Sequence, residues 1–165
     1  MKKFVIAILV VAMVVSLCSC ATLDKTIKFS VESYQVEQVE IYHLETAYDQ
    51  SNVRNLREEN TPVCVLNGLT EQGGQKVTQL MEEISSLHFV VGVVFFPVPV
   101  DWTYIYEGYV VCVVYANGYD IVAPQGQFYY SVDFKGDAHY KYGHAHYEGE
   151  AEWSGIIGKY VQNVG

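Results

Sequence analysis

The sequence predicts an α+β domain in which an antiparallel β-sheet meander is covered on one face by two amphipathic helices. Three observations support this fold class. Along residues 104–142, apolar residues alternate with polar ones, and short turn sequences interrupt them. Apolar residues recur at helical spacing along about 71–87, and again along about 150–162. Each helix would have one apolar stripe, for which a sheet face is the natural partner.

The two predicted helices differ in how well their own sequences support them. The first should begin after Thr70, a residue suited to an N-cap, and its stripe consists of Val77, Leu80, Met81, Ile84 and Leu87. The stripe of the second consists of Trp153, Ile156, Ile157, Tyr160 and Val161. Gly155 and Gly158 each lower its helix propensity by about 1 kcal/mol relative to Ala. We therefore expect the second helix to depend on docking.

Strands account for most of the remaining chain. We predict them at 27–31, 36–45, 62–66, 88–96, 104–115, 119–123, 128–134 and 139–142. The pair Asn117-Gly118 supplies the positive φ angles of a type I′ hairpin turn, so a tight hairpin is expected there. Residues 46–61 are polar and predict a loop with one helical turn at Val53–Glu58.

The first twenty residues have the pattern of an export signal. Lys2 and Lys3 precede an apolar run from Phe4 to Leu17, which leads into Leu17-Cys18-Ser19-Cys20. This ending resembles the lipobox of bacterial lipoproteins. In that motif an aliphatic residue stands three positions before the modified cysteine, and a small residue stands directly before it.

The resemblance implies a lipoprotein of the cell envelope. Residues 1–19 would be a signal peptide, 20–26 a lipidated tether and 27–165 a single domain. Cys20 would receive a diacylglyceryl group, become the first residue of the mature chain and carry further acyl groups such as palmitate. Two or more acyl chains anchor a protein stably. The domain would lie on the extracytoplasmic side of a cell membrane or outer membrane.

Two other interpretations of the N-terminus stay open. A transmembrane helix needs about 20 apolar residues, and this run is roughly two turns shorter. Ordinary secretory cleavage before Cys20, without a lipid, is consistent with the small residue Ser19. That cleavage would nevertheless leave a cysteine at the position where lipidation acts.

The composition is acidic, with 10 Lys and Arg against 19 Asp and Glu and a net charge of −9. Loss of Lys2 and Lys3 with the signal would bring the net charge to about −11. Such a surface repels phosphates, so no nucleic-acid partner is expected. It is consistent with a solvated exterior, with a bound cation or with a basic protein partner.

Cys64 and Cys112 are the cysteines within the predicted domain. A disulfide is permitted outside the cytoplasm, but each residue lies in an apolar run, where free cysteine behaves as a small hydrophobic residue. Their spacing does not decide between these states, so the pairing stays open. Neither has a second thiol or a histidine close in sequence, and a zinc site built on them is not expected.

Three of the five histidines, His139, His144 and His146, lie within residues 137–148. If 144–148 is extended, His144, His146 and Glu148 point to one side. Two imidazoles and a carboxylate can bind Zn²⁺. The alternative is the solvent-facing side of a strand. Because nothing in the sequence fixes these groups at ligand distance, we predict no metal site and no cofactor.

The sequence contains 14 tyrosines, many of them in the meander. Exposed tyrosines would suit a glycan or a protein partner, whereas half-buried sheet faces also favour tyrosine. No catalytic motif is present, such as GxSxG, HExxH or a P-loop, so we predict no catalytic residues. The leading hypothesis is a non-catalytic binding or interaction module. The alternatives are a metal-binding protein using the His139-His144-His146 cluster, and an acidic inhibitor or immunity-like protein for a basic partner.

Overall fold

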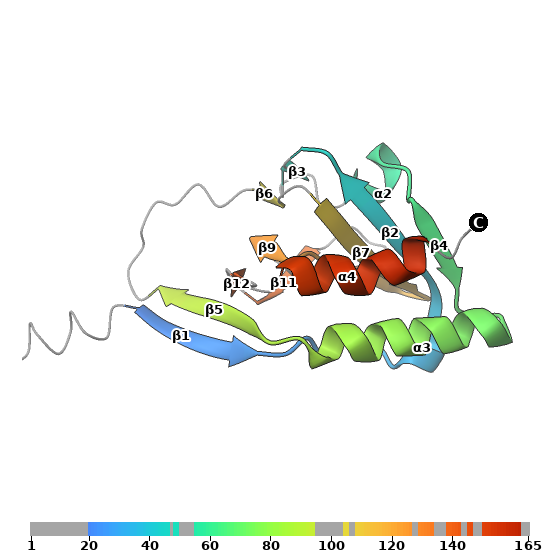
Figure 1. Ribbon diagram of the computed structural model, residues 1–165, viewed down its shortest axis with the longest axis horizontal. Helices are drawn as coiled ribbons and strands as arrows, with labels where there is room; N and C mark the ends of the chain where they lie inside the picture. Colours follow the sequence, from blue (N-terminus) through green and yellow to red (C-terminus); the bar gives the residue numbers. More distant parts are fainter. Residues whose placement is uncertain are drawn as a thin grey trace, which may run out of the picture.

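The predicted α+β fold is confirmed in a computed structural model (Figure 1). The structure describes residues 20–46, 48–49, 55–94, 104–105, 108–126, 129–133, 138–142, 145–146 and 150–162. Its main sheet has six strands, each antiparallel to its neighbours. In spatial order they are β11 (Ala138–Tyr142), β10 (Tyr129–Asp133), β8 (Gly118–Val122), β7 (Gly108–Tyr115), β2 (Val36–Leu44) and β4 (Cys64–Asn67).

Both predicted helices are present and share one face of this sheet (Figure 1). They are α3 (Glu71–Ser86) and α4 (Glu150–Val161). Their apolar stripes meet the sheet in one core, to which β2 contributes Val39 and Ile41. The Thr70 hydroxyl accepts a hydrogen bond from the N–H of Gly73, which confirms the predicted N-cap.

The docking expected of the glycine-containing helix α4 is centred on Trp153. Its side chain is completely buried. Its indole N–H donates to the carbonyl oxygen of Tyr109 on β7, at 3.0 Å. A buried indole without such an acceptor would leave an unsatisfied donor, at a cost of about 1–3 kcal/mol. The hydrogen bond therefore fixes both the depth and the position of α4 on the sheet.

The opposite sheet face carries a second core. It contains Tyr42, Val110, Cys112 and Ile121 and is capped by Leu56 of the short helix α2 (Leu56–Glu59). α2 lies inside the loop predicted for 46–61, close to the helical turn expected there. The central strands β2, β7 and β8 are therefore largely buried on both faces of the sheet.

Two smaller sheets accompany the main one. The first contains β1 (Cys20–Lys25), β5 (Phe89–Val94), β12 (Ala145–His146) and β9 (Gln125–Gly126). The second pairs β3 (Tyr48–Asp49) with β6 (Tyr104–Ile105). β1 pairs with β5 from Cys20 onward, so most of the stretch expected to be a tether is part of a sheet. The pairing satisfies backbone groups along one edge of the apolar strand β5.

The strand predicted at 27–31 is wrong, because these residues are not paired in a sheet. Ile27 is buried, and Phe29 and Val31 pack against the helix-side core, which accounts for the apolar alternation. The backbone N–H of Ser30 instead donates to the carboxylate of Asp120, at 2.6 Å. A side chain distant in sequence thus takes the place of a neighbouring strand.

The hairpin predicted around Asn117-Gly118 forms, but the type I′ turn does not. Tyr115 pairs with Gly118, so the connecting residues are Ala116 and Asn117, and neither has a positive φ angle. Gly118 meets a different requirement, because a Cβ atom there would collide with the carbonyl oxygen of Val132 on β10. The glycine is needed for close strand approach rather than for turn geometry.

This geometry predicts opposite effects for one substitution at two glycines. Gly118→Ala should destabilise the fold by about 1–3 kcal/mol, because β10 must shift. Gly155→Ala should stabilise it by up to about 1 kcal/mol, because a Cβ meets no atom there and alanine favours the helix. Urea unfolding of both variants measures the difference. A Gly118→Ala protein as stable as the parent would contradict the close approach.

Candidate binding surface

Two adjoining hollows lie between α3 and the chain segment that leads into β2. The first has a volume of ≈ 580 Å³ and is lined by η1 (Ser33–Gln35), by the turn before α3 and by the first turns of α3. The second has a volume of ≈ 570 Å³ and lies between residues 26–33 and the following turns of α3. We refer to the two hollows together as the α3 groove.

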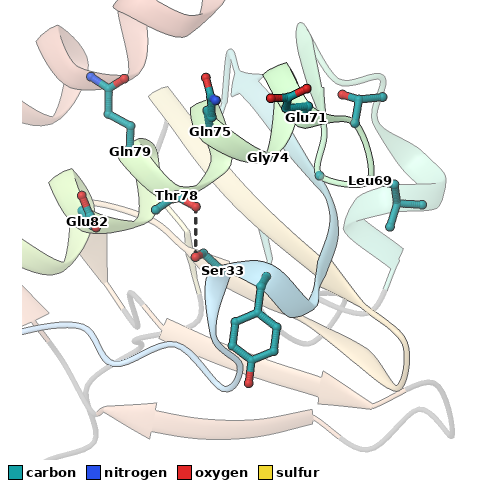
Figure 2. A pocket seen from close by; sticks show the side chains of 11 residues that line it. Ser33, Leu69, Glu71, Gly74, Gln75, Thr78, Gln79 and Glu82 are labelled. Carbon is teal, nitrogen blue, oxygen red and sulfur yellow. Dashed lines mark hydrogen bonds between the residues drawn. The ribbon is translucent and has the colours of Figure 1, made fainter.

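Two hydrogen-bonded residues lie where the two hollows meet. Thr78 Oγ1 on α3 donates to Ser33 Oγ at 3.0 Å, and both residues line both hollows. Figure 2 shows Thr78 pointing toward Ser33 across the space between α3 and η1. This bond ties one wall of the groove to the other.

Leu69 stands at the end of the first hollow, on a turn with a fixed conformation. Its backbone N–H donates to Asn67 Oδ1 at 2.9 Å, and the neighbouring Thr70 caps α3. Gly68 lies so close to the backbone of Val36 that a Cβ would collide with its carbonyl oxygen. The Leu69 side chain is nevertheless 78% exposed. A rigid turn therefore presents an aliphatic side chain to solvent.

Tyr34 lines the same hollow from η1. Glu32 and Gln35 form a capping box around this single turn: the Glu32 N–H donates to Gln35 Oε1 at 3.1 Å, and the Gln35 N–H donates to the Glu32 carbonyl oxygen at 2.9 Å. The Tyr34 side chain is 85% exposed. Nothing in its spacing or neighbours marks Tyr34 in the sequence, and it was not among the tyrosines of the predicted meander.

The wall of the second hollow is fixed by Asp120. This carboxylate is fully buried and accepts hydrogen bonds from the Ser30 N–H at 2.6 Å, from the Ser30 hydroxyl at 2.6 Å and from the Tyr115 hydroxyl at 3.2 Å. A buried charge needs several such donors. The two bonds from Ser30 hold segment 26–31 against the sheet, and Phe29 and Val31 pack beside the groove.

Two of the exposed apolar side chains line the groove, those of Tyr34 and Leu69. Among the described residues, the large hydrophobic side chains that are exposed are those of Tyr34, Val63, Val65 and Leu69. Val65 lies on β4, the edge strand, and Val63 and Leu69 flank that strand. Tyr34 precedes β2, the neighbour of β4 in the sheet. Val65 alternates with Cys64 and Leu66 of the helix-side core and therefore faces the opposite side of the sheet, whereas Tyr34 and Leu69 share one hollow.

The groove is mainly acidic. Glu71 and Glu82 line the first hollow, and Glu32 and Glu82 line the second, where Lys28 is the one cation among the lining residues. Glu71 and Glu82 form no ion pair with any residue that the structure describes. Their charges are therefore available to a cationic group that enters the groove.

A second polar cluster lies on the opposite sheet face, around Glu40. Arg57 of α2 binds this carboxylate with two hydrogen bonds of 2.8 Å. The Tyr42 hydroxyl and the Gln38 amide donate to it at 2.6 Å each. Arg57 also lies over the ring of Tyr119, 5.2 Å from its centroid. Two donors bind each carboxylate oxygen, and the bidentate pair ties α2 to the sheet.

The environment of Glu40 favours its charged form. Burial raises the pKa of this carboxyl, but the hydrogen bonds and charge of Arg57, with the bonds from Tyr42 and Gln38, outweigh burial and hold the pKa below the ordinary value. A nearly buried carboxylate with a low pKa and occupied acceptor sites is a poor general base. The cluster fits a structural role.

Cys64 and Cys112 are both free and buried. They pair with consecutive residues of β2, Cys64 with Ile41 and Cys112 with Glu40, so they lie on opposite faces of the sheet. They are also two strands apart, about 10 Å in the sheet, which is too far for a disulfide. Burial raises the pKa of both thiols, which suits inert cysteines.

The predicted histidine cluster falls largely outside the described residues, which do not include His144 or Glu148. The backbone places His139 on β11 of the main sheet and His146 on β12 of the four-stranded sheet. Within the described part of the chain, no group of three or more His, Cys, Asp or Glu side chains could hold a metal ion.

The tyrosines of the meander do not form an exposed row where their side chains are described. Tyr119 is buried, and Tyr109 and Tyr115 are half-buried. Tyr129 pairs with Tyr142, and Tyr130 with Tyr140, in the register of β10 and β11. For the described side chains, high β propensity and partial burial explain the tyrosine content.

No protein-family model, curated protein or solved structure matches this chain. In the part of the chain that the structure describes, no helix has the length and apolar character needed to cross a membrane.

The Glu40 cluster predicts a pH-dependent contribution to stability. Because the folded-state pKa of Glu40 is lowered, its contribution is complete well above the unfolded value of about 4.3 and is lost as the pH falls through the folded value. Glu40→Gln should lower the free energy of unfolding by about 1–3 kcal/mol near pH 7. The deficit should shrink toward pH 3.

Urea unfolding of the parent and the variant across this pH range measures the effect. Glu37→Gln is the matched control, because Glu37 is exposed on the same strand. A deficit for Glu40→Gln that does not change with pH would contradict the assignment.

Proposed function

We propose that this protein is a non-catalytic interaction module, tethered outside the cytoplasm by a lipid on Cys20, that binds a protein partner through the α3 groove. The observation that carries this proposal is the exposure of Tyr34 and Leu69, which line the same hollow from η1 and from the turn before α3. Tyrosine is one of the residue types that supply most of the binding energy at protein interfaces, and an exposed leucine beside it adds apolar surface to bury.

The hydrogen bonds that fix the walls of the groove support a binding role for the exposed side chains of Tyr34 and Leu69. Tyr34 is held by a capping box, Leu69 by a hydrogen-bonded turn and the walls by the Ser33–Thr78 bond. These bonds fix the backbone from which both side chains project, and a backbone that is ordered before binding loses less conformational entropy when a partner docks. The path of the chain along the groove is therefore already defined in the free protein.

The polar clusters support a role without catalysis. Glu40 and Asp120 are the buried charged residues among those described, and each is engaged by several hydrogen-bond donors of the protein itself. Neither lines the groove. The groove contains carboxylates, amides and hydroxyls, but no histidine or cysteine.

The tether can be tested on the full chain produced in a bacterium that processes lipoproteins. We expect the mature protein to begin at Cys20, to carry a diacylglyceryl group by mass spectrometry and to fractionate with membranes. Cys20→Ala should lose both the added mass and the membrane association. Cys18→Ala should keep both, because Cys18 would leave with the signal peptide. Membrane association that survives Cys20→Ala would contradict a lipid tether.

The binding surface can be tested by photocross-linking in cells. We expect p-benzoylphenylalanine at Tyr34 or at Leu69 to give the same discrete protein adduct after irradiation. Asn117 is the control, because it is exposed on the β7–β8 turn and does not line the α3 groove. The same adducts from all three positions, or none from Tyr34 and Leu69, would contradict the proposal.

A further inference from the structure

We infer that the α3 groove binds an extended, positively charged peptide segment of its partner, with an apolar side chain in the second hollow. This inference rests on the proposed function and adds the chemistry of the partner. It follows from the charge of the groove, from its apolar lining and from the polar groups between its two hollows.

The negative charge of the groove favours a cationic ligand. Glu71 and Glu82 lie more than two helical turns apart on α3 and have no ion-pair partner among the described residues. The whole chain carries a net charge of −9. Complementary charge raises the rate of association and opposes acidic partners. Lysine or arginine side chains of a bound segment would neutralise the two carboxylates.

The second hollow adds a preference for an apolar group. Its lining includes Ile27, Phe29, Val31 and Met81, while Lys28, Glu32 and Glu82 supply its charges. An apolar lining with a few polar groups is typical of sites that bury one side chain or a small ligand. An apolar side chain there would add burial to the charge contacts.

The Ser33–Thr78 bond favours a peptide that crosses both hollows. Thr78 uses its hydroxyl hydrogen to donate to Ser33, so the Ser33 hydroxyl keeps its own hydrogen for a further acceptor. A peptide carbonyl is such an acceptor. An extended chain also directs successive side chains to opposite sides, which suits a cationic residue and an apolar residue placed along one groove.

The experiment measures fluorescence anisotropy of short labelled peptides with the mature lipidated protein in a non-ionic detergent. The probes alternate Leu with Lys, with Ser or with Glu. We expect the Lys/Leu peptide to bind most tightly. Glu71→Gln/Glu82→Gln should weaken its binding by about 3- to 10-fold, as expected for two exposed charge contacts.

The matched control is Glu45→Gln/Glu58→Gln, which removes the same charge at exposed positions that do not line the groove. We expect less than about a 2-fold change for this control, because distant exposed charges are screened by salt. Exposed substitutions should leave folding intact, and unfolding midpoints check this for both variants.

Two results would overturn the inference: equal loss of binding in both double variants, or equal binding of the Ser/Leu and Lys/Leu peptides. The first would indicate attraction to overall charge alone, and the second would show that the groove does not select a cationic segment. A discrete cross-linked partner at Tyr34 together with either result would leave the interaction module in place and reject only the basic segment.

Discussion

The buried carboxylate of Asp120 determines where the chain before β2 runs, and much of the candidate surface depends on that path. Three hydrogen bonds from Ser30 and Tyr115 satisfy its charge, and the two from Ser30 secure segment 26–31 to the main sheet. Without these donors the carboxylate would be buried and unpaired, which is among the costliest defects that a core can contain. Folding therefore places Phe29 and Val31 beside α3, where they form one wall of the groove.

The two sheet faces are closed by different kinds of interaction. On one face, two helices dock through apolar stripes, and the buried Trp153 is fixed by a single hydrogen bond. On the other face, a four-residue helix is too short to be stable alone and is secured by Leu56 and by the bidentate Arg57–Glu40 pair. Both faces are thus occupied by the chain itself. The exposed apolar residues lie at the β4 edge and beside α3, which places the candidate surface there.

Elements that depend on local periodicity can be predicted from the sequence, whereas features that depend on contacts between distant residues cannot. Both main helices and the strands around the meander follow from spacing alone, because each apolar stripe is encoded in consecutive turns or alternating positions. The apolar alternation of Ile27, Phe29 and Val31 also has the strand period, but a hydrogen bond to Asp120, ninety residues away, takes the place of a strand partner. The groove could not be predicted, since its walls come from segments that meet only in the folded chain. Gly118 shows the same limit, because its conflict lies with β10 rather than within its own turn.

The start of β1 at Cys20 limits how far the domain can lie from a membrane. Six residues of strand rise about 20 Å, and the lining of the second hollow begins at Thr26, directly after this strand. With a lipid on Cys20, the near end of the α3 groove would be held within roughly that distance of the bilayer, without a free linker to extend its reach. Such a binding site samples only partners at the same membrane surface or those that reach close to it. Both the closeness of the groove to the membrane and its negative charge would then determine which partners can bind.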